Sequence, residues 1–176
     1  MIDAALIQAC APNVEAETVL AIIRVESGGD RIALATNRPS GAVRLRPRDF
    51  AHAVALATAE IRRGNSVDIG LMQINSRNLP RLGLTVETVL DPCRNLAAGA
   101  RILTDAYDTA SRKHGDGQGA LRAALSAYNT GNQLAGFRNG YVARYYPRWS
   151  TPRITTTVSA AVYSANPTVY RRTTKE

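Results

Sequence analysis

Long hydrophobic runs are absent from this 176-residue sequence. No segment approaches the roughly 20 consecutive apolar residues that a membrane-spanning helix needs. The opening residues, Met1-Ile2-Asp3, also lack the basic start and apolar stretch of a signal peptide. The sequence therefore predicts no membrane span. It leaves the cytoplasm open, and equally an exported, mature chain whose targeting segment has been removed.

Metal-ligating and nucleophilic side chains are also sparse. The two histidines, His52 and His114, stand alone in the sequence and are more typical of structural or solvated positions than of metal ligands. A phosphate-binding glycine loop and a Ser/His/Asp arrangement cannot be placed. We therefore expect neither a metal nor a cofactor.

The two cysteines, Cys10 and Cys93, are far apart and form no metal-binding or CxxC spacing. Two interpretations fit them equally well. They are two buried thiols, or they form one long-range disulfide, which would indicate an oxidising compartment.

The net charge of +8 and the pI of about 10.1 favour an anionic partner. Nucleic acid, a membrane surface and an acidic cell-wall polymer all fit that charge. The basic residues are scattered and have no aromatic residues interleaved with them, which argues against nucleic acid.

Apolar residues recur at helical spacing along most of the chain, which predicts a mainly α fold. The expected longer helices are residues 2–10, 15–26, 47–63, 95–110, 120–128 and 140–149. Residues 30–47 fit an irregular loop or a small hairpin, and residues 66–78 a buried extended turn with no evident strand neighbour. Residues 91–93 are expected to end a short helix that starts near Thr85. One domain is expected over residues 1–149, followed by an extended tail over residues 150–176.

Glu26 stands at the end of an apolar run and just before Ser27-Gly28-Gly29. The run predicts a buried helix, and the glycines predict its end because glycine adopts the left-handed backbone that closes many helices. The carbonyl groups of a helix end and partial burial both disfavour a carboxylate anion. Glu26 is therefore a candidate general acid. A solvated last residue of an amphipathic helix explains the same stretch equally well.

Two later stretches stand out together with Glu26-Ser27. They are Gly-Leu-Met-Gln-Ile-Asn at residues 70–75 and Ala-Tyr-Asn-Thr-Gly at residues 127–131. Their order and spacing resemble the soluble lytic transglycosylase family, which has a lysozyme-like α fold. Those enzymes carry a Glu-Ser pair at a helix end, then a G-L-M-Q segment, then an A-Y-N segment.

Residues 66–79 and 91–100 are similar to one branch of that family, the transglycosylases of type IV secretion and conjugation machines. The resemblance covers residues 2–149 and leaves the tail uncovered. Cysteines pair in that branch, so the resemblance implies a Cys10–Cys93 disulfide and a periplasmic location. It also implies other secretion subunits as partners, with the protein itself a monomer.

The substrate implied by the resemblance is the glycan strand of peptidoglycan. Glu26 would protonate the bond between N-acetylmuramic acid and N-acetylglucosamine, then deprotonate the muramyl 6-hydroxyl, leaving a 1,6-anhydro sugar. The implied substrate-binding residues are Ser27, Gly70, Met72, Gln73, Asn75, Tyr128, Asn129 and Tyr141. Asp68 is more typical of a loop hydrogen-bonding residue than of a second catalytic acid. A muramidase that uses water and a non-catalytic glycan-binding scaffold remain the alternatives.

Overall fold

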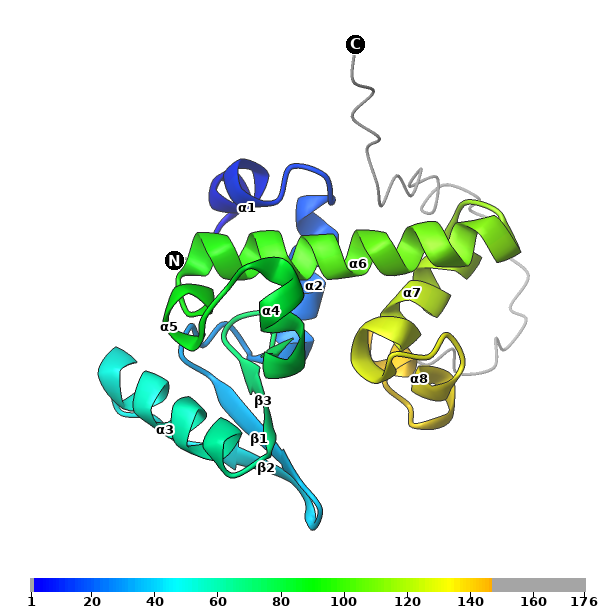
Figure 1. Cartoon of the computed structure of the whole chain (residues 1–176). Helices are drawn as coiled ribbons and strands as arrows, with labels where there is room; N and C mark the ends of the chain where they lie inside the picture. Colours follow the sequence, from blue (N-terminus) through cyan, green and yellow to red (C-terminus); the bar gives the residue numbers. More distant parts are fainter. Residues whose placement is uncertain (1, 147–176) are drawn as a thin grey trace, which may run out of the picture. The chain divides into compact units, whose positions relative to one another are not determined.

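The computed structural model describes residues 2–146, which fall into two compact units divided between residues 102 and 103. Unit 1 contains α1 (Ala4–Cys10), α2 (Ala16–Glu26), β1 (Leu34–Arg38), β2 (Gly41–Leu45), α3 (Phe50–Arg62), β3 (Ser66–Ile69), β4 (Ile74–Asn75), η1 (Ser76–Asn78), α4 (Leu79–Leu82) and α5 (Val86–Val89) (Figure 1). The long helix α6 (Pro92–His114) crosses the boundary. Unit 2 contains the rest of α6 with α7 (Gln118–Thr130), α8 (Ala135–Arg138) and η2 (Val142–Arg144).

The mainly α fold is confirmed, and so is the hairpin within residues 30–47. The predicted tail, residues 150–176, lies outside the described residues. Among residues 2–146, none of the helices combines the length and the apolar character that crossing a bilayer requires.

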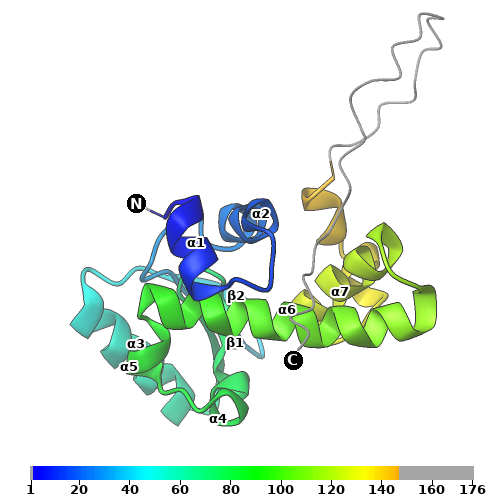
Figure 2. The same ribbon diagram turned by 90° about the horizontal axis from the view of Figure 1, so that it is seen from above.

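Helix starts follow the local sequence. The Asp3 side chain accepts a hydrogen bond from the Leu6 amide at 2.9 Å and caps α1, and Asp49 caps α3 in the same way through His52. Neighbouring helices α1 and α2 can be followed in both views (Figure 1, Figure 2). These caps explain why the boundaries of the early helices lie close to their expected positions.

Three boundary predictions were wrong. The Asp91-Pro92-Cys93 segment opens α6 instead of ending a helix, because proline fits a first helical turn and Asp91 accepts a hydrogen bond from the Arg94 amide at 2.9 Å. Helix α7 continues through Thr130 to Gly131, whose φ of +71° ends it. The segment expected as one helix over residues 140–149 holds only η2 within its described part.

Residues 66–78 also differ from the prediction, because β3 has a strand on each side. The sheet order is β2-β1-β3-β4, all antiparallel, with Thr36 opposite Val67 and Asp68 opposite Asn75. One neighbour lies about thirty residues earlier in the chain, and the other is only two residues long. A distant strand and a two-residue strand both lack a recognisable strand pattern beside residues 66–69, so the sequence alone did not predict either neighbour.

Each unit has its own apolar interior. The largest fully buried side chains of unit 1 are Ile7, Val19, Ile22, Leu34, Val67, Ile69, Leu71, Met72, Ile74, Val89 and Leu96. In unit 2, Leu103, Leu121, Leu125 and Tyr141 are buried. The segment singled out in the sequence, residues 70–75, thus contributes Leu71, Met72 and Ile74 to the core of unit 1.

A carboxylate, Glu60 of α3, is almost completely buried against the sheet. Its oxygens accept hydrogen bonds from Arg38 at 3.0 and 3.1 Å, Thr36 at 2.9 Å, Arg63 at 2.6 Å and Asn65 at 2.9 Å. Arg38 and then Thr36 are the main causes that lower the pKa of Glu60 from 4.5 to about 2, against the opposing effect of burial. The hydrogen bonds from Thr36 and Arg38 to Glu60 join α3 to β1.

This network makes the protein sensitive to acid. Because the pKa of Glu60 is lower in the folded state, its ionised form stabilises the fold above pH 4.5, and that contribution is lost as the pH falls from 4.5 to about 2. We expect Glu60→Gln to flatten the pH dependence of the unfolding free energy within this window, as measured by urea titration. The exposed carboxylate Glu87 supplies the control, Glu87→Gln. Parallel curves for Glu60→Gln and the unaltered protein would contradict the assignment.

Candidate active site

Glu26 is the last residue of α2, as expected, and is half-buried. The Ser27 and Gly28 amides both donate to the Ile23 carbonyl, at 3.0 and 2.9 Å, and Gly28 has a φ of +65°. The helix therefore ends immediately after the carboxylate, in the left-handed turn that the glycines predict.

Ser27 is buried, and its hydroxyl is used within the chain. It donates to the Ile23 carbonyl at 3.2 Å and accepts from the Gly29 amide at 3.1 Å. These two bonds fix the backbone that follows Glu26. The structure therefore places Ser27 as a support of this turn.

The segment Gly70-Leu71-Met72-Gln73 makes a tight turn between β3 and β4. The Gly70 amide donates to the Ala33 carbonyl at 2.8 Å, and the Gln73 amide donates to the Gly70 carbonyl at 3.1 Å. Gln73 has a φ of +49°, which is unusual for a residue with a side chain. Its side-chain nitrogen donates to the carbonyls of Ala33 and Gly70, at 3.1 and 2.8 Å. The strained backbone is thus held by its own side chain, a feature typical of functional sites.

Asn95 of α6, which the sequence did not point to, supports the same turn through its side chain. Its side chain accepts from the Met72 amide at 2.8 Å and donates to the carbonyls of Ile69 and Val89 at 3.0 and 2.8 Å. The residue is 1% exposed. An asparagine one position before Leu96 on the apolar side of a helix was the available signal, since a buried amide needs partners.

Met72 is fully buried, and its side chain packs against Gly99 of α6. Its position is that of a core residue beneath the turn. Its complete burial does not favour a direct contact between Met72 and a sugar. Because Met72 packs so closely against α6, a side chain at position 99 would clash with it, which explains the glycine at that position.

The packing at Gly70 supports a stability prediction. A Cβ on Gly70 would meet the side chain of Asn95, with Cγ at 3.0 Å, while Gly64 has a similar φ of +84° and open space around it. We expect Gly64→Ala to cost about 1 kcal/mol of unfolding free energy from backbone strain. Gly70→Ala should cost about 1–3 kcal/mol more because the Asn95 contact must shift. Equal costs in denaturant titration would show that this contact is unimportant.

Asn75 joins this turn to the neighbouring strand. Its Oδ1 accepts from the Arg77 amide at 3.1 Å, and its Nδ2 donates to Asp68 at 2.7 Å. Asn75 therefore both caps η1 and contacts a carboxylate.

Unit 2 holds the remaining three predicted site residues. Tyr128 is half-buried on α7, and Asn129 is exposed and accepts from the Asn139 side chain at 3.1 Å. Asn139 also accepts from the Tyr141 amide at 2.9 Å, so it links Asn129 to Tyr141. Tyr141 is 2% exposed, and its hydroxyl lies 2.6 Å from that of Tyr145. Asn139 was missed because it carries no pattern of its own.

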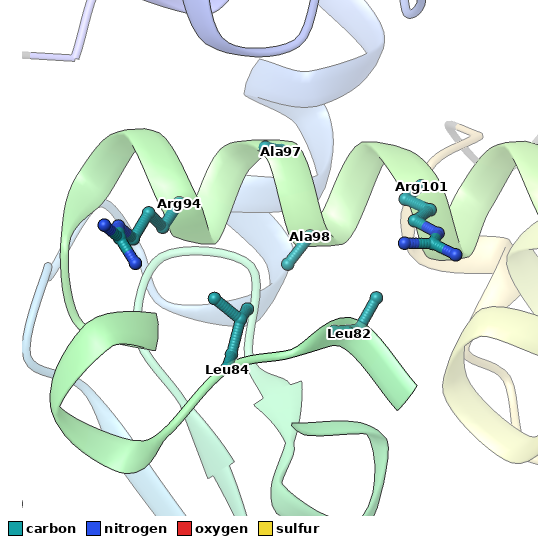
Figure 3. Close-up of a pocket in the computed structure, with 6 residues that line it drawn as sticks. All are labelled: Leu82, Leu84, Arg94, Ala97, Ala98 and Arg101. Atoms are coloured by element: carbon teal, nitrogen blue, oxygen red, sulfur yellow. The ribbon is translucent and has the colours of Figure 1, made fainter. Parts of the chain in front are cut away.

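Two surface pockets lie in unit 1. One, of about 220 Å³, is bounded by Leu82, Leu84, Arg94, Ala97, Ala98 and Arg101, with the arginines two helical turns apart on α6 (Figure 3). The other, of about 710 Å³, is lined in part by Gly29, Asp30, Phe50 and Leu90. The residues that line the two pockets do not include the predicted site residues. No group of three or more candidate metal ligands occurs within residues 2–146.

Comparison with protein families gives a match over residues 3–145 to the transglycosylase SLT domain. The chain belongs to this family. The lysozyme-like, mainly α fold expected for its members is thereby confirmed.

Among curated proteins, this SLT domain is 42% identical to protein virB1 of Rhizobium radiobacter over 138 residues, or 77% of this chain and 55% of the relative. It is 40% identical to type IV secretion system protein virB1 of Brucella abortus biovar 1 over 134 residues, or 76% of this chain and 56% of the relative. The chain thus spans about half the length of the curated relatives it matches. No solved structure gives a match.

The matched region contains Glu26, both later motifs and both cysteines. The structure joins Cys10 to Cys93 in a disulfide, with Cα atoms 5.1 Å apart, so the second interpretation of the cysteines is correct. Within unit 1, the structure connects Gly70, Gln73 and Asn75 through the turn, its strands and Asp68. The roles of all the predicted site residues stay predictions.

Proposed function

We propose that this SLT domain is a lytic transglycosylase that cleaves peptidoglycan glycan strands. Support comes from the family match over residues 3–145 and from the place of Glu26, half-buried at a helix end with its following turn fixed by Ser27. A carboxyl group held in this way suits proton transfer. The observation that carries the proposal is this Glu26-Ser27 helix end in a chain that belongs to the family.

The reaction needs one carboxyl group because the substrate supplies the nucleophile. Glu26 gives its proton to the glycosidic oxygen as the bond from the muramyl anomeric carbon to that oxygen breaks. The resulting carboxylate takes the proton of the muramyl 6-hydroxyl, whose oxygen then bonds to the anomeric carbon. Atoms balance without water, and Glu26 ends protonated. Ordinary glycosidases use a second carboxylate to activate water or to attack the sugar.

The turn at residues 70–73 supplies polar groups for an N-acetylated sugar in this proposal. The Gln73 side-chain oxygen accepts no hydrogen bond from residues 2–146, and its amide nitrogen is fixed by two carbonyls. It is therefore a preorganised acceptor for a sugar amide or hydroxyl. Met72 contributes as the packed base of the turn, and Tyr128, Asn129 and Tyr141 as the glycan-binding residues of unit 2.

We also infer the cellular setting. Similar proteins are named as components of type IV secretion systems, so local opening of the wall for such a machine is the proposed role. The Cys10–Cys93 disulfide favours an oxidising compartment, and we propose the periplasm. The net charge of +8 suits a polymer whose peptide stems carry carboxylates.

Mass spectrometry of digested peptidoglycan tests this proposal. We expect products that end in 1,6-anhydromuramic acid. Reducing muramyl ends would replace the proposal with hydrolysis. Binding to cell-wall sacculi without any cleavage would instead favour a scaffold.

A further inference from the structure

The small sheet of unit 1 has two different faces. Thr36 of β1 and Val67 and Ile69 of β3 point to one side and are fully buried, and Thr36 bonds to Glu60 of α3 there. Figure 1 shows α3 running alongside these strands. Because side chains alternate along a strand, the residues between them belong to the opposite face. The polar residues of that opposite face are Asn37, Ser66, Asp68 and Asn75, with the exposed Arg44 on the outer strand β2.

Asp68 lies at the centre of the polar face, between two asparagines on the neighbouring strands. Its Oδ2 accepts from the Asn37 side chain at 2.8 Å, and its Oδ1 accepts from the Asn75 side chain at 2.7 Å. Asn37, Asp68 and Asn75 are each half-buried. The carboxylate is thus fixed in orientation, and its residue remains partly accessible.

Asp68 differs from the buried carboxylate Glu60 in the number and charge of its hydrogen-bond donors. Glu60 receives five hydrogen bonds, three of them from arginines, and its charge is balanced within the fold. Both donors to Asp68 are uncharged amides, one to each oxygen. Burial raises the pKa of Asp68, against the lowering effect of the two amides. A carboxylate can accept about four hydrogen bonds, so each Asp68 oxygen keeps capacity for a further donor.

Asp68 is also tied to the segment that the proposed function uses. It lies two residues before Gly70, and its partner Asn75 lies two residues after Gln73. The polar face and the strained turn at residues 70–73 therefore form one continuous piece of backbone.

We propose that Asp68, oriented by Asn37 and Asn75, binds hydroxyl groups of the glycan strand. Each internal N-acetylglucosamine unit of a β-1,4-linked strand keeps free hydroxyls at C3 and C6. These are uncharged donors, and they match fixed carboxylate oxygens that have unused acceptor capacity. The inference rests on the proposed function, because it assigns a further sugar contact to that same substrate. Asn37 and Asn75 act as positioning residues in it.

Binding of chitohexaose, a hexamer of N-acetylglucosamine, tests the assignment. The measurement is titration calorimetry on the full chain carrying Glu26→Gln, which excludes cleavage. Adding Asp68→Asn keeps the shape of the side chain and removes its charge and one acceptor. We expect affinity to fall by about tenfold or more, since a hydrogen bond to a charged group is lost. Glu87→Gln, which removes an exposed charge from the same unit, should leave the affinity unchanged.

Circular dichroism establishes that each variant is folded at the titration temperature. Unchanged affinity in folded Asp68→Asn overturns the inference. If that variant does not fold, Asn37→Ala keeps the carboxylate and removes one of its two donors. Several-fold weaker binding is then expected, and unchanged binding overturns the inference.

The two proposals fail in different ways. Reducing muramyl ends from the unaltered protein would overturn the transglycosylase reaction and leave the Asp68 contact standing. Cleavage to anhydro ends, together with full chitohexaose affinity in Asp68→Asn, would overturn the Asp68 contact and leave the transglycosylase reaction standing.

Discussion

Glu26→Gln should reduce peptidoglycan cleavage by about 10³-fold or more, since general acid–base catalysis alone contributes about 10²–10⁴-fold. In the proposed reaction the same carboxyl group protonates the leaving oxygen and later deprotonates the 6-hydroxyl. Glutamine keeps the size of the side chain and can do neither. Release of anhydromuropeptides, followed by mass spectrometry, measures the loss.

A matched control lies on the same helix. Glu17 is an exposed carboxylate in the first turn of α2, while Glu26 is at the end. Glu17→Gln should keep full activity apart from a small stability effect at the helix start. Circular dichroism checks that Glu26→Gln is folded at the assay temperature. Retention of wall-cleaving activity by folded Glu26→Gln would show that another group is the acid.

The sequence predicted the local parts of this fold well. Helix α2 ends at Glu26 because two glycines follow it, and the hairpin forms around the Pro39-Ser40 turn. Such features depend on a few neighbouring residues, whose backbone preferences are visible in the sequence.

Non-local features were not accessible in the same way. Pairing of β3 with β1 joins residues about thirty positions apart, and the amide of Asn95 supports a turn more than twenty positions earlier. Nothing in the sequence links Glu60, which falls within the predicted helix 47–63, to Arg38 of β1, which donates hydrogen bonds to it. Each of these depends on which elements pack together, and no local propensity encodes that.

The candidate site shows the same division. Glu26, Gly70 and Gln73 were found through motifs, and the structure adds why the turn at residues 70–73 keeps its shape. The sequence favoured Asp68 as a loop hydrogen-bonding residue over a second catalytic acid, and the structure places it on strand β3. Its two asparagine partners lie on different strands, so the cluster became visible only once the sheet register was known. Cys10 and Cys93 left two interpretations open until their Cα atoms were placed 5.1 Å apart.

Removing the Cys10–Cys93 disulfide should cause the largest loss of stability. The bond closes a loop of 83 residues, and the chain-entropy relation gives about 4.5 kcal/mol of stabilisation for that length. For a protein of this size, at about 2–4 °C per kcal/mol, we expect Cys10→Ser with Cys93→Ser to lower the melting temperature by roughly 9–18 °C. Calorimetry of the variant and the unaltered protein measures the shift.

Local structure strengthens this expectation. Helix α1 has only seven residues, which is too short for stability by itself, and the disulfide joins its last residue to the first turn of α6. Glu26 is at the far end of α2 from the segment that connects α2 to α1. The variant should therefore keep its cleavage activity at temperatures where it remains folded. Dithiothreitol should lower the melting temperature of the unaltered protein to that of the double variant and leave the variant unchanged. A shift below about 2 °C would mean that packing of α1 on α2 already restrains the N-terminal segment without the covalent bond.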